Sequence, residues 1–426
     1  MQTKELISPN PADYKHLNIN RTTKIVLSVL LVLLVLEKIF NLDGFNYNLD
    51  LDVYRLGAQR VLDGQELYDG AFHITEDIYL PFTYPPISAL LFTPLALVHL
   101  NVSAVLLTCA TVGVTWWMLA YTLNSAARLD RMSAGWISVA LTAVFIYLSP
   151  INTTIGYGQI NVLLMGIVFV DMLVVPRRYR GLLTGAAVAI KLTPAVFGLW
   201  FLLRKDWGSI LRMGAATIGA TAIGWLILPQ DSLKYWTHTL IETGRIGSSA
   251  YALNQSINGL LYRSGLRTDE SSGLLWVVLV CLALAVIAFI MHNLLKAQAP
   301  IAALCVNSLF ALLASPVSWS HHWTWAPILL VALASYATAN RAFPLANPRW
   351  LSITLVTLGF IAFAYEPYAF VPFDNDTEYH WNTWQIIVAN SYMWWTILAL
   401  IVMTIRFALP HGKTQEDAEM SATSTT

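Results

Sequence analysis

The feature of this sequence that most constrains its fold is a series of long apolar runs. A helix needs about 20 apolar residues to cross a bilayer, because the hydrocarbon core is about 30 Å thick and each residue advances the helix by about 1.5 Å. Of the 426 residues, 56% are hydrophobic and only 12% are charged, whereas soluble proteins carry about 25% charged residues. Since a helix satisfies its own backbone hydrogen bonds in lipid, the sequence predicts an all-α, polytopic membrane protein.

The apolar runs predict a membrane domain over residues 23–408, with about 10–13 spanning, short or re-entrant segments. The spans are expected near residues 23–41, 102–124, 133–149, 160–175, 209–229, 273–294, 299–315, 322–338, 350–366 and 387–407.

Basic residues border these runs on one side of the expected membrane, in the N-terminal segment and near residues 128–131, 177–180, 204–212, 341–349 and 406–413. Cytoplasmic flanks are enriched in Lys and Arg, so we expect segment 1–22 and tail 409–426 to lie in the cytoplasm. The tail is polar and is expected to be disordered. The first loop on the opposite face, residues 42–83, carries eight acidic residues and two arginines. No basic stripe indicates binding of nucleic acid.

Two stretches do not fit a simple count of spans. Residues 181–203 have basic residues on both sides and contain Lys191 in an apolar run. A hairpin of two half-helices, with Lys191 at its tip inside the membrane, keeps all of these basic residues on one side. Residues 84–101, which contain Pro94, are expected to form a partial or membrane-surface helix.

Lys191 is the first candidate functional residue. A charge at the middle of the bilayer costs about 2.5–3.5 kcal/mol on insertion scales, so it needs an anion or water. Its ammonium group would suit a lipid-linked phosphate, although the side chain could instead reach the membrane interface.

Two carboxylates and two histidines are further candidates. Asp50 and Asp52 follow the first span, and one of them is predicted to be a catalytic base. The alternative is that Asp50 caps a short helix that begins at Asp52. His321 and His322 stand among tryptophans at an expected membrane interface. Imidazole groups can donate to phosphate, and neighbouring residues on a helix face different ways, so only one of the two is expected to enter a site.

Clustered amides form a weaker signal on the same face. Gln159 and Asn161, and further along the chain Asn254 and Gln255, suit the binding of sugar hydroxyls. Such residues are also common in loops and at helix starts. The three cysteines lie in apolar runs without the spacing of a metal site.

Together these motifs resemble one family over residues 22–405. The matching blocks are Asp-x-x-Val53-Tyr54, Leu62–Tyr68, Tyr84-Pro-Pro86, Gly158-Gln-Ile-Asn161, Lys191-Leu-Thr-Pro194, Asn254-Gln-Ser256 and Ser315–Trp323. They resemble the polyprenol-phosphate-mannose-dependent mannosyltransferases of glycosyltransferase family 87, which have the GT-C membrane fold, and most of all the actinobacterial enzymes of phosphatidylinositol mannoside and lipomannan synthesis.

The resemblance implies an inverting transfer of mannose from polyprenyl-phosphate-mannose to a mannosylated glycolipid, with an α-(1→2) linkage formed on the extracytoplasmic face of the plasma membrane. It implies Asp50 as the base, with Asp52 as the alternative. For this reaction we assign Lys191 and one of His321 and His322 to the donor phosphate, because a leaving phosphate is stabilised by fixed positive charge and donors. The sugar and acceptor contacts are assigned to Tyr54, Tyr84, Gln159, Asn161, Asn254, Gln255 and Trp319.

Three further points concern cofactors, the partner of the histidine pair and competing functions. A monophosphate donor lacks the diphosphate that a metal ion bridges in nucleotide-sugar transferases, so no metal or other cofactor is expected. Ser320 stands where the family often has an acidic residue, which leaves the hydrogen-bond partner of the histidine pair undefined. A transporter of lipid-linked sugars, or a GT-C transferase of another sugar such as arabinose, would show a similar arrangement of apolar runs.

Overall fold

The computed structural model describes residues 14–41, 47–75, 78–242, 247–268, 273–339, 343, 345 and 348–409. Residues 1–13 and 410–426, which make up most of the two predicted cytoplasmic ends, lie outside the described residues. The predictions of their location and of a disordered tail therefore stay predictions.

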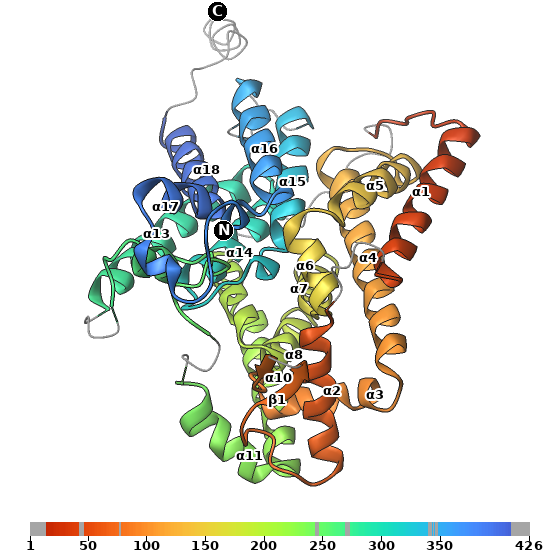
Figure 1. Ribbon diagram of the computed structural model, residues 1–426. Coiled ribbons are helices and arrows are strands. Elements are labelled where there is room, and N and C mark those ends of the chain that lie inside the picture. The colour runs from red at the N-terminus through yellow and green to blue at the C-terminus, as the bar shows by residue number, and fades with distance from the viewer. Residues whose placement is uncertain are drawn as a thin grey trace, which may run out of the picture.

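Helices form almost all of the secondary structure, as the sequence predicts (Figure 1). They are α1 Arg21–Ile39, α2 Leu49–Leu62, α3 Pro86–Ala96, α4 Leu100–Ala126, α5 Arg131–Phe145, α6 Ser149–Tyr157, α7 Asn161–Leu173, α8 Leu182–Ile190, α9 Gly198–Leu203, α10 Trp207–Ile227, α11 Pro229–Lys234, α12 Ile257–Arg263, α13 Leu274–Lys296, α14 Pro300–Ala314, α15 Trp325–Ala339, α16 Arg349–Ala364, α17 Thr383–Ala389 and α18 Ser391–Ala408.

Short 3₁₀ and π turns connect several of these helices: η2 Thr193–Phe197, η3 Tyr235–Thr239, η5 Ser320–His322, η6 Pro367–Phe370 and η7 Thr377–His380. The all-α prediction missed one element. Strands β1 Phe72–Thr75 and β2 Ile78–Leu80 pair antiparallel within the first polar loop.

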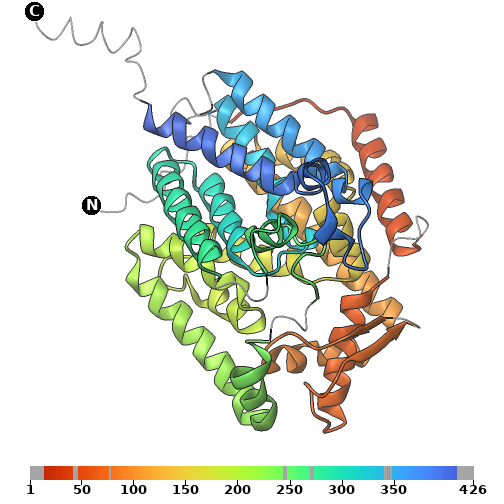
Figure 2. The same cartoon turned by 60° about the vertical axis from the view of Figure 1, so that its left-hand side comes forward.

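The helices pack in groups around a continuous apolar core. α1, α4 and α5 lie together, α13 to α18 form a second group, and α2, α3, α8, α10 and α11 form a third (Figures 1 and 2). The core contains fully buried aromatic residues from several parts of the chain, including Phe169 of α7, Phe201 of α9, Phe363 of α16 and Trp323 between η5 and α15. α3 is a separate short helix before α4, which agrees with the partial helix expected there.

The predicted spans correspond to helices, but many of these helices are short. By length and composition, α4, α10, α13 and α18 are able to cross a membrane, and the pair α5 and α6, bent by 73°, would make a fifth span. α7, α14, α15 and α16 have 13 to 16 residues, which is about 20–24 Å of helix. Among the described residues, four or five spans are fewer than the predicted 10–13 segments. The other predicted spans fall on shorter helices, which cover only part of the bilayer, or on α1.

Residues 181–203 form the predicted helical hairpin, which we call the Lys191 hairpin. The ideal Cβ of Gly181 would meet Ser209 and Met213, and that of Gly185 would meet Met213 and Ala216, so α8 and α10 run in the same direction. The chain between them must therefore turn back, and it does so through η2 and α9.

Contacts at its two ends give the orientation of the hairpin. At the base, Arg212 Nη2 donates to the carbonyl of Arg177 at 2.7 Å. The α8 arm has nine residues, so its tip lies about 14 Å from that base. The far end of α10 meets the first polar loop, because Asp231 in α11 accepts a hydrogen bond from the Leu67 amide at 2.8 Å. The arginine-rich base of the hairpin and the acidic first loop therefore lie at opposite ends of α10.

We expect Gly185→Ala to destabilise the protein, because the added Cβ would lie 2.3 Å from the Met213 carbonyl oxygen and 2.8 Å from the Ala216 Cβ. Overpacking of this kind costs about 1–3 kcal/mol. Thermal unfolding of purified protein in detergent measures the effect. The matched control is Gly214→Ala in α10, where no atom lies within 4 Å of the added Cβ. Equal unfolding midpoints for the two variants would contradict the close packing of α8 on α10.

Candidate functional site

The start of α2 places the two candidate carboxylates. Asn48 precedes the helix in the left-handed conformation, and its side chain makes no capping hydrogen bond. Both Asp50 and Asp52 lie in the first turn. The cap-only interpretation of Asp50 is wrong, because the helix begins at Leu49 and not at Asp52.

The turn after α6 holds this helix start. The backbone amide of Asn48 donates to the carbonyl of Gly156 at 2.8 Å. Gly158 has a φ of +67°, and a Cβ there would lie 2.6 Å from the Leu51 Cβ. This close approach brings Asp50 next to Gln159, the residue that follows Gly158.

The two carboxylates have different surroundings. Asp52 pairs with Arg55 at 3.5 Å within the same helix. Asp50 instead receives a hydrogen bond from Gln159 and lies in the field of Lys191. Burial raises the pKa of Asp50 from 3.8 to about 6, while Gln159 and Lys191 act in the opposite direction. A carboxylate with a pKa near the working pH is suited to accept a proton, which favours Asp50 over Asp52 as the base.

Gln159 links this carboxylate to a pair of buried tyrosines. Its Oε1 accepts hydrogen bonds from the hydroxyls of Tyr54 at 2.9 Å and Tyr84 at 3.2 Å. Its Nε2 faces Asp50 and also lies 3.4 Å from Nε2 of His321. Both ends of the amide thus have protein partners, and the contact of Gln159 with sugar hydroxyls stays a prediction.

Lys191 reaches the same cluster from the tip of its hairpin. Its Nζ donates to Asn161 Oδ1 at 2.9 Å and to the Tyr84 hydroxyl at 3.2 Å. Both partners are neutral. An ammonium group has three N–H donors, so one donor of Lys191 remains beyond these two bonds.

The two histidines lie on η5 and are both close to the cluster. Burial, with a smaller effect of the Lys191 charge, lowers the pKa of His321 to about 3 and lowers that of His322 as well. Both rings are therefore neutral at pH 7. The turn is fixed by Asn161, whose Nδ2 donates to the His321 carbonyl at 2.9 Å, and by Thr154, whose hydroxyl donates to the same oxygen at 3.1 Å.

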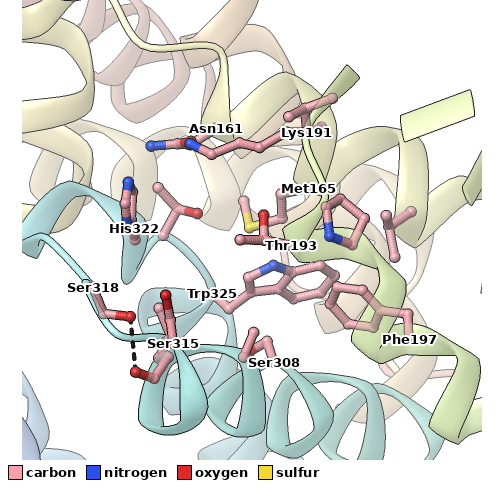
Figure 3. Close-up of a pocket in the computed structure, with 16 residues that line it drawn as sticks. Asn161, Met165, Lys191, Thr193, Phe197, Ser308, Ser315, Ser318, His322 and Trp325 are labelled. Carbon is pink, nitrogen blue, oxygen red and sulfur yellow. Dashed lines mark hydrogen bonds between the residues drawn. The ribbon is translucent and has the colours of Figure 1, made fainter. Parts of the chain in front are cut away.

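Only His322 lines the adjacent pocket, which has a volume of about 70 Å³. Lys191 and Asn161 extend toward each other at one end of this pocket, and His322 lies near them (Figure 3). Apolar side chains, among them Phe197 and Trp325, line the other part. His321 faces Gln159 instead. The expectation that only one of the two histidines enters the site stays a prediction, and the lining of the pocket makes His322 the candidate.

Three predicted sugar ligands lie in and beside the segment that leads into the histidine turn, and the backbone amide of Trp319 donates to Nδ1 of His322 at 3.2 Å. Asn254 is fully buried, and its amide contacts the backbone of Ser249, Pro316 and Ser318. Gln255 Nε2 donates to the carbonyls of Ala252 and Ala389, both at 2.9 Å. Trp319 pairs by its backbone with Asn254. These contacts hold the 315–320 segment in place, and the contact of the three residues with a sugar stays a prediction.

Thr154 and Tyr157 of α6 are site residues that the motifs did not identify. The ring of Tyr157 meets the His321 ring edge-on, with 5.3 Å between the centroids. Nδ1 of His321 has no hydrogen-bond partner among the described residues. Ser320 stands where an acidic partner of the histidine was expected. In the structure, Nε2 of His321 lies 3.4 Å from Nε2 of Gln159 instead, a residue that only the tertiary fold brings near.

Within the described part of the chain, no group of three or more His, Cys, Asp or Glu side chains could hold a metal ion. Independence of a metal stays a prediction from the chemistry of the donor.

The fold and this site define a multi-pass membrane protein that places a carboxylate in the field of a lysine set in an apolar run. Residues 82–316 match glycosyltransferase family 87. The chain is 37% identical over 376 residues, 84% of each chain, to the polyprenol-phosphate-mannose-dependent alpha-(1-2)-phosphatidylinositol mannoside mannosyltransferase of Mycobacterium tuberculosis. The protein of the same name from Mycolicibacterium smegmatis is 37% identical over 382 residues, which cover 84% of this chain and 83% of that relative.

A third relative is the polyprenol-phosphate-mannose-dependent alpha-(1-2)-phosphatidylinositol pentamannoside mannosyltransferase of M. smegmatis. It is 32% identical over 317 residues, which cover 74% of this chain and 76% of the relative. No solved structure matches the chain. The chain belongs to glycosyltransferase family 87, and it is a membrane-bound glycosyltransferase.

If Asp50 is the base, kcat/KM should rise with pH through a single ionisation near pH 6. The carboxyl is protonated below its pKa of about 6 and cannot accept a proton there. The check is an initial-rate pH profile at low substrate concentration, with reconstituted enzyme. The interval from pH 5 to pH 7 extends about one unit to either side of that pKa. A profile that is flat over this interval would rule out this assignment.

Proposed function

We propose that this protein transfers mannose from polyprenol-phosphate-mannose to a phosphatidylinositol mannoside and forms an α-(1→2) bond. The names of three relatives support the donor, the linkage and the class of acceptor. The observation that carries the proposal is the meeting of Asp50 and Lys191 in one cluster, joined by Gln159 and Tyr84.

The proposed reaction inverts the anomeric centre of a β-linked mannosyl phosphate. Asp50 removes the proton from the acceptor hydroxyl as that oxygen bonds to the anomeric carbon. The bond between this carbon and the phosphate oxygen breaks, and its electron pair leaves with the phosphate. An inverting transfer needs no nucleophilic carboxylate, so a single base is sufficient.

Lys191 is proposed to stabilise the negative charge that develops on the leaving phosphate. Its ammonium group has a donor beyond those bonded to Asn161 and Tyr84, and a fixed cation in a partly buried place needs little reorganisation as the charge develops. His322, on the same side of the pocket, is proposed to donate to the phosphate through a neutral imidazole N–H. The apolar part of the pocket is suited to the first carbons of the lipid carrier.

The site is proposed to face the outside of the cell. The basic residues at the base of the Lys191 hairpin are expected in the cytoplasm by the positive-inside rule. α10 runs from that base to the acidic first loop, and α2, which carries Asp50, belongs to that loop. The same rule places both ends of the chain in the cytoplasm.

The test is to incubate reconstituted enzyme with radiolabelled polyprenyl-phosphate-mannose and a panel of phosphatidylinositol mannosides, and to map the linkage in the product. We expect a new α-(1→2) mannose with the wild-type enzyme. Asp50→Asn should lower the rate by about 10²–10⁴-fold, because it removes the base. Asp52→Asn is the matched control and should retain most of the activity.

Two results would contradict the proposal. A product formed only from another lipid-linked sugar would exclude mannose as the transferred group. Full activity of Asp50→Asn together with loss of activity in Asp52→Asn would transfer the role of base to Asp52.

A further inference from the structure

We propose that the base of the Lys191 hairpin binds the headgroup of an anionic phospholipid. Four arginines, Arg177, Arg180, Arg204 and Arg212, lie close together there, on the face opposite to the first polar loop. Arg178 and Lys205, which are exposed, adjoin them in the chain, and we call the six residues the basic cluster. The proposal does not depend on the reaction that the enzyme catalyses.

Backbone carbonyls hold much of this cluster together. Arg212 Nε donates to the Arg180 carbonyl at 2.8 Å, and its Nη2 donates to the Arg177 carbonyl at 2.7 Å. Arg204 lies over the ring of Trp200 and within electrostatic range of Arg177 and Arg180. Several positive charges are therefore held close to one another, and the neutral carbonyls that hold them do not cancel their charge.

The carboxylates near the cluster do not balance its charge. Asp206 pairs with Arg177 at 3.4 Å. Asp171 lies close to Arg180, but its oxygens already accept from the amides of Gly181 and Thr184 and from the Thr184 hydroxyl. Six cations against these two carboxylates leave four positive charges in excess among the described residues, and Nε of Arg180 is buried there without a hydrogen-bond partner.

The surroundings of the cluster select a lipid over a soluble anion. Apolar and aromatic side chains stand exposed around it: Leu183 40%, Leu202 48%, Tyr179 50%, Trp207 59% and Leu211 73%. Trp and Tyr concentrate at the level of the lipid headgroups. A ligand at this position meets cations and acyl-chain surface together, which is the chemistry of an anionic phospholipid.

Other basic flanks on the same face lack this arrangement. Arg131 is exposed at the start of α5, where Asp130 caps the helix through the amides of Met132 and Ser133. It therefore provides a matched control. A general preference for positive charge on the cytoplasmic face would treat Arg131 and the cluster alike, whereas a built headgroup site would not.

The test titrates the full-length enzyme in a neutral detergent with dioctanoyl phosphatidylglycerol and follows the thermal unfolding midpoint. The lipid should raise the midpoint saturably, because a ligand of the folded state stabilises it. Arg178→Gln with Lys205→Gln changes two exposed cations. Each Lys or Arg near anionic lipid is worth about 1 kcal/mol, so the half-saturating concentration should rise about 30-fold. Arg131→Gln should leave it unchanged, and Lys205→Gln alone, with a shift of about fivefold, serves if the double variant does not fold.

Three outcomes would overturn the proposal. Dioctanoyl phosphatidylcholine at equal concentration could raise the midpoint as much, which would show that charge is not recognised. Inorganic phosphate alone could give the same effect, which would identify a site for a soluble anion. A loss of affinity in Arg131→Gln equal to that in the double variant would reduce the effect to general surface charge.

Discussion

The structure depends on the ammonium group of Lys191, held inside an apolar bundle by two neutral oxygen atoms. Asn161 and Tyr84 solvate it at 2.9 and 3.2 Å, and the carboxylate of Asp50 lies in its field. A lone charge in lipid is costly, so a chain that keeps one without a direct ion pair must supply polar partners around it. The tyrosine pair, Gln159 and the histidine turn are all connected to those partners.

Helix α7 organises this arrangement because it forms hydrogen bonds with the Lys191 hairpin at both its tip and its base. Asn161, its first residue, binds Lys191 at the tip, and Asp171, near its end, binds the amides of Gly181 and Thr184 at the base. The two residues are ten positions apart, about 15 Å along the helix. The α8 arm has a similar length, so α7 fixes the depth at which the lysine lies. The same contacts link the proposed lipid site at the base to the reaction site at the tip.

The sequence predicts those parts of the fold that follow from local chemistry. Hydropathy locates the helices, and the basic residues on both sides of residues 181–203 are sufficient to predict the hairpin, because a single crossing would place Arg204 and Arg212 on the wrong side. The motif around Tyr54 identifies Asp50 only through the family resemblance. The structure adds a physical reason, since Asp52 pairs with Arg55 whereas Asp50 faces Gln159 and Lys191.

Other features depend on contacts between distant segments and leave no local signal. The amide of Gln255 meets the carbonyl of Ala389, 134 positions away, so no pattern near Gln255 distinguishes a structural amide from a sugar ligand. Thr154 is a similar case, because its hydroxyl reaches the backbone of His321 across 167 positions. The short helices and the 73° bend between α5 and α6 also follow from tertiary packing and not from hydropathy alone.

The central claim is that Asp50 takes the proton of the acceptor hydroxyl and Lys191 binds the leaving phosphate of the donor, on opposite sides of the anomeric carbon. The most direct test is an experimental structure of the enzyme with a non-hydrolysable phosphonate analogue of polyprenyl-phosphate-mannose. We expect a phosphonate oxygen within hydrogen-bonding distance of Lys191 Nζ, and the anomeric carbon turned toward Asp50. A headgroup bound away from Lys191, or a sugar whose anomeric carbon faces away from Asp50, would contradict the account.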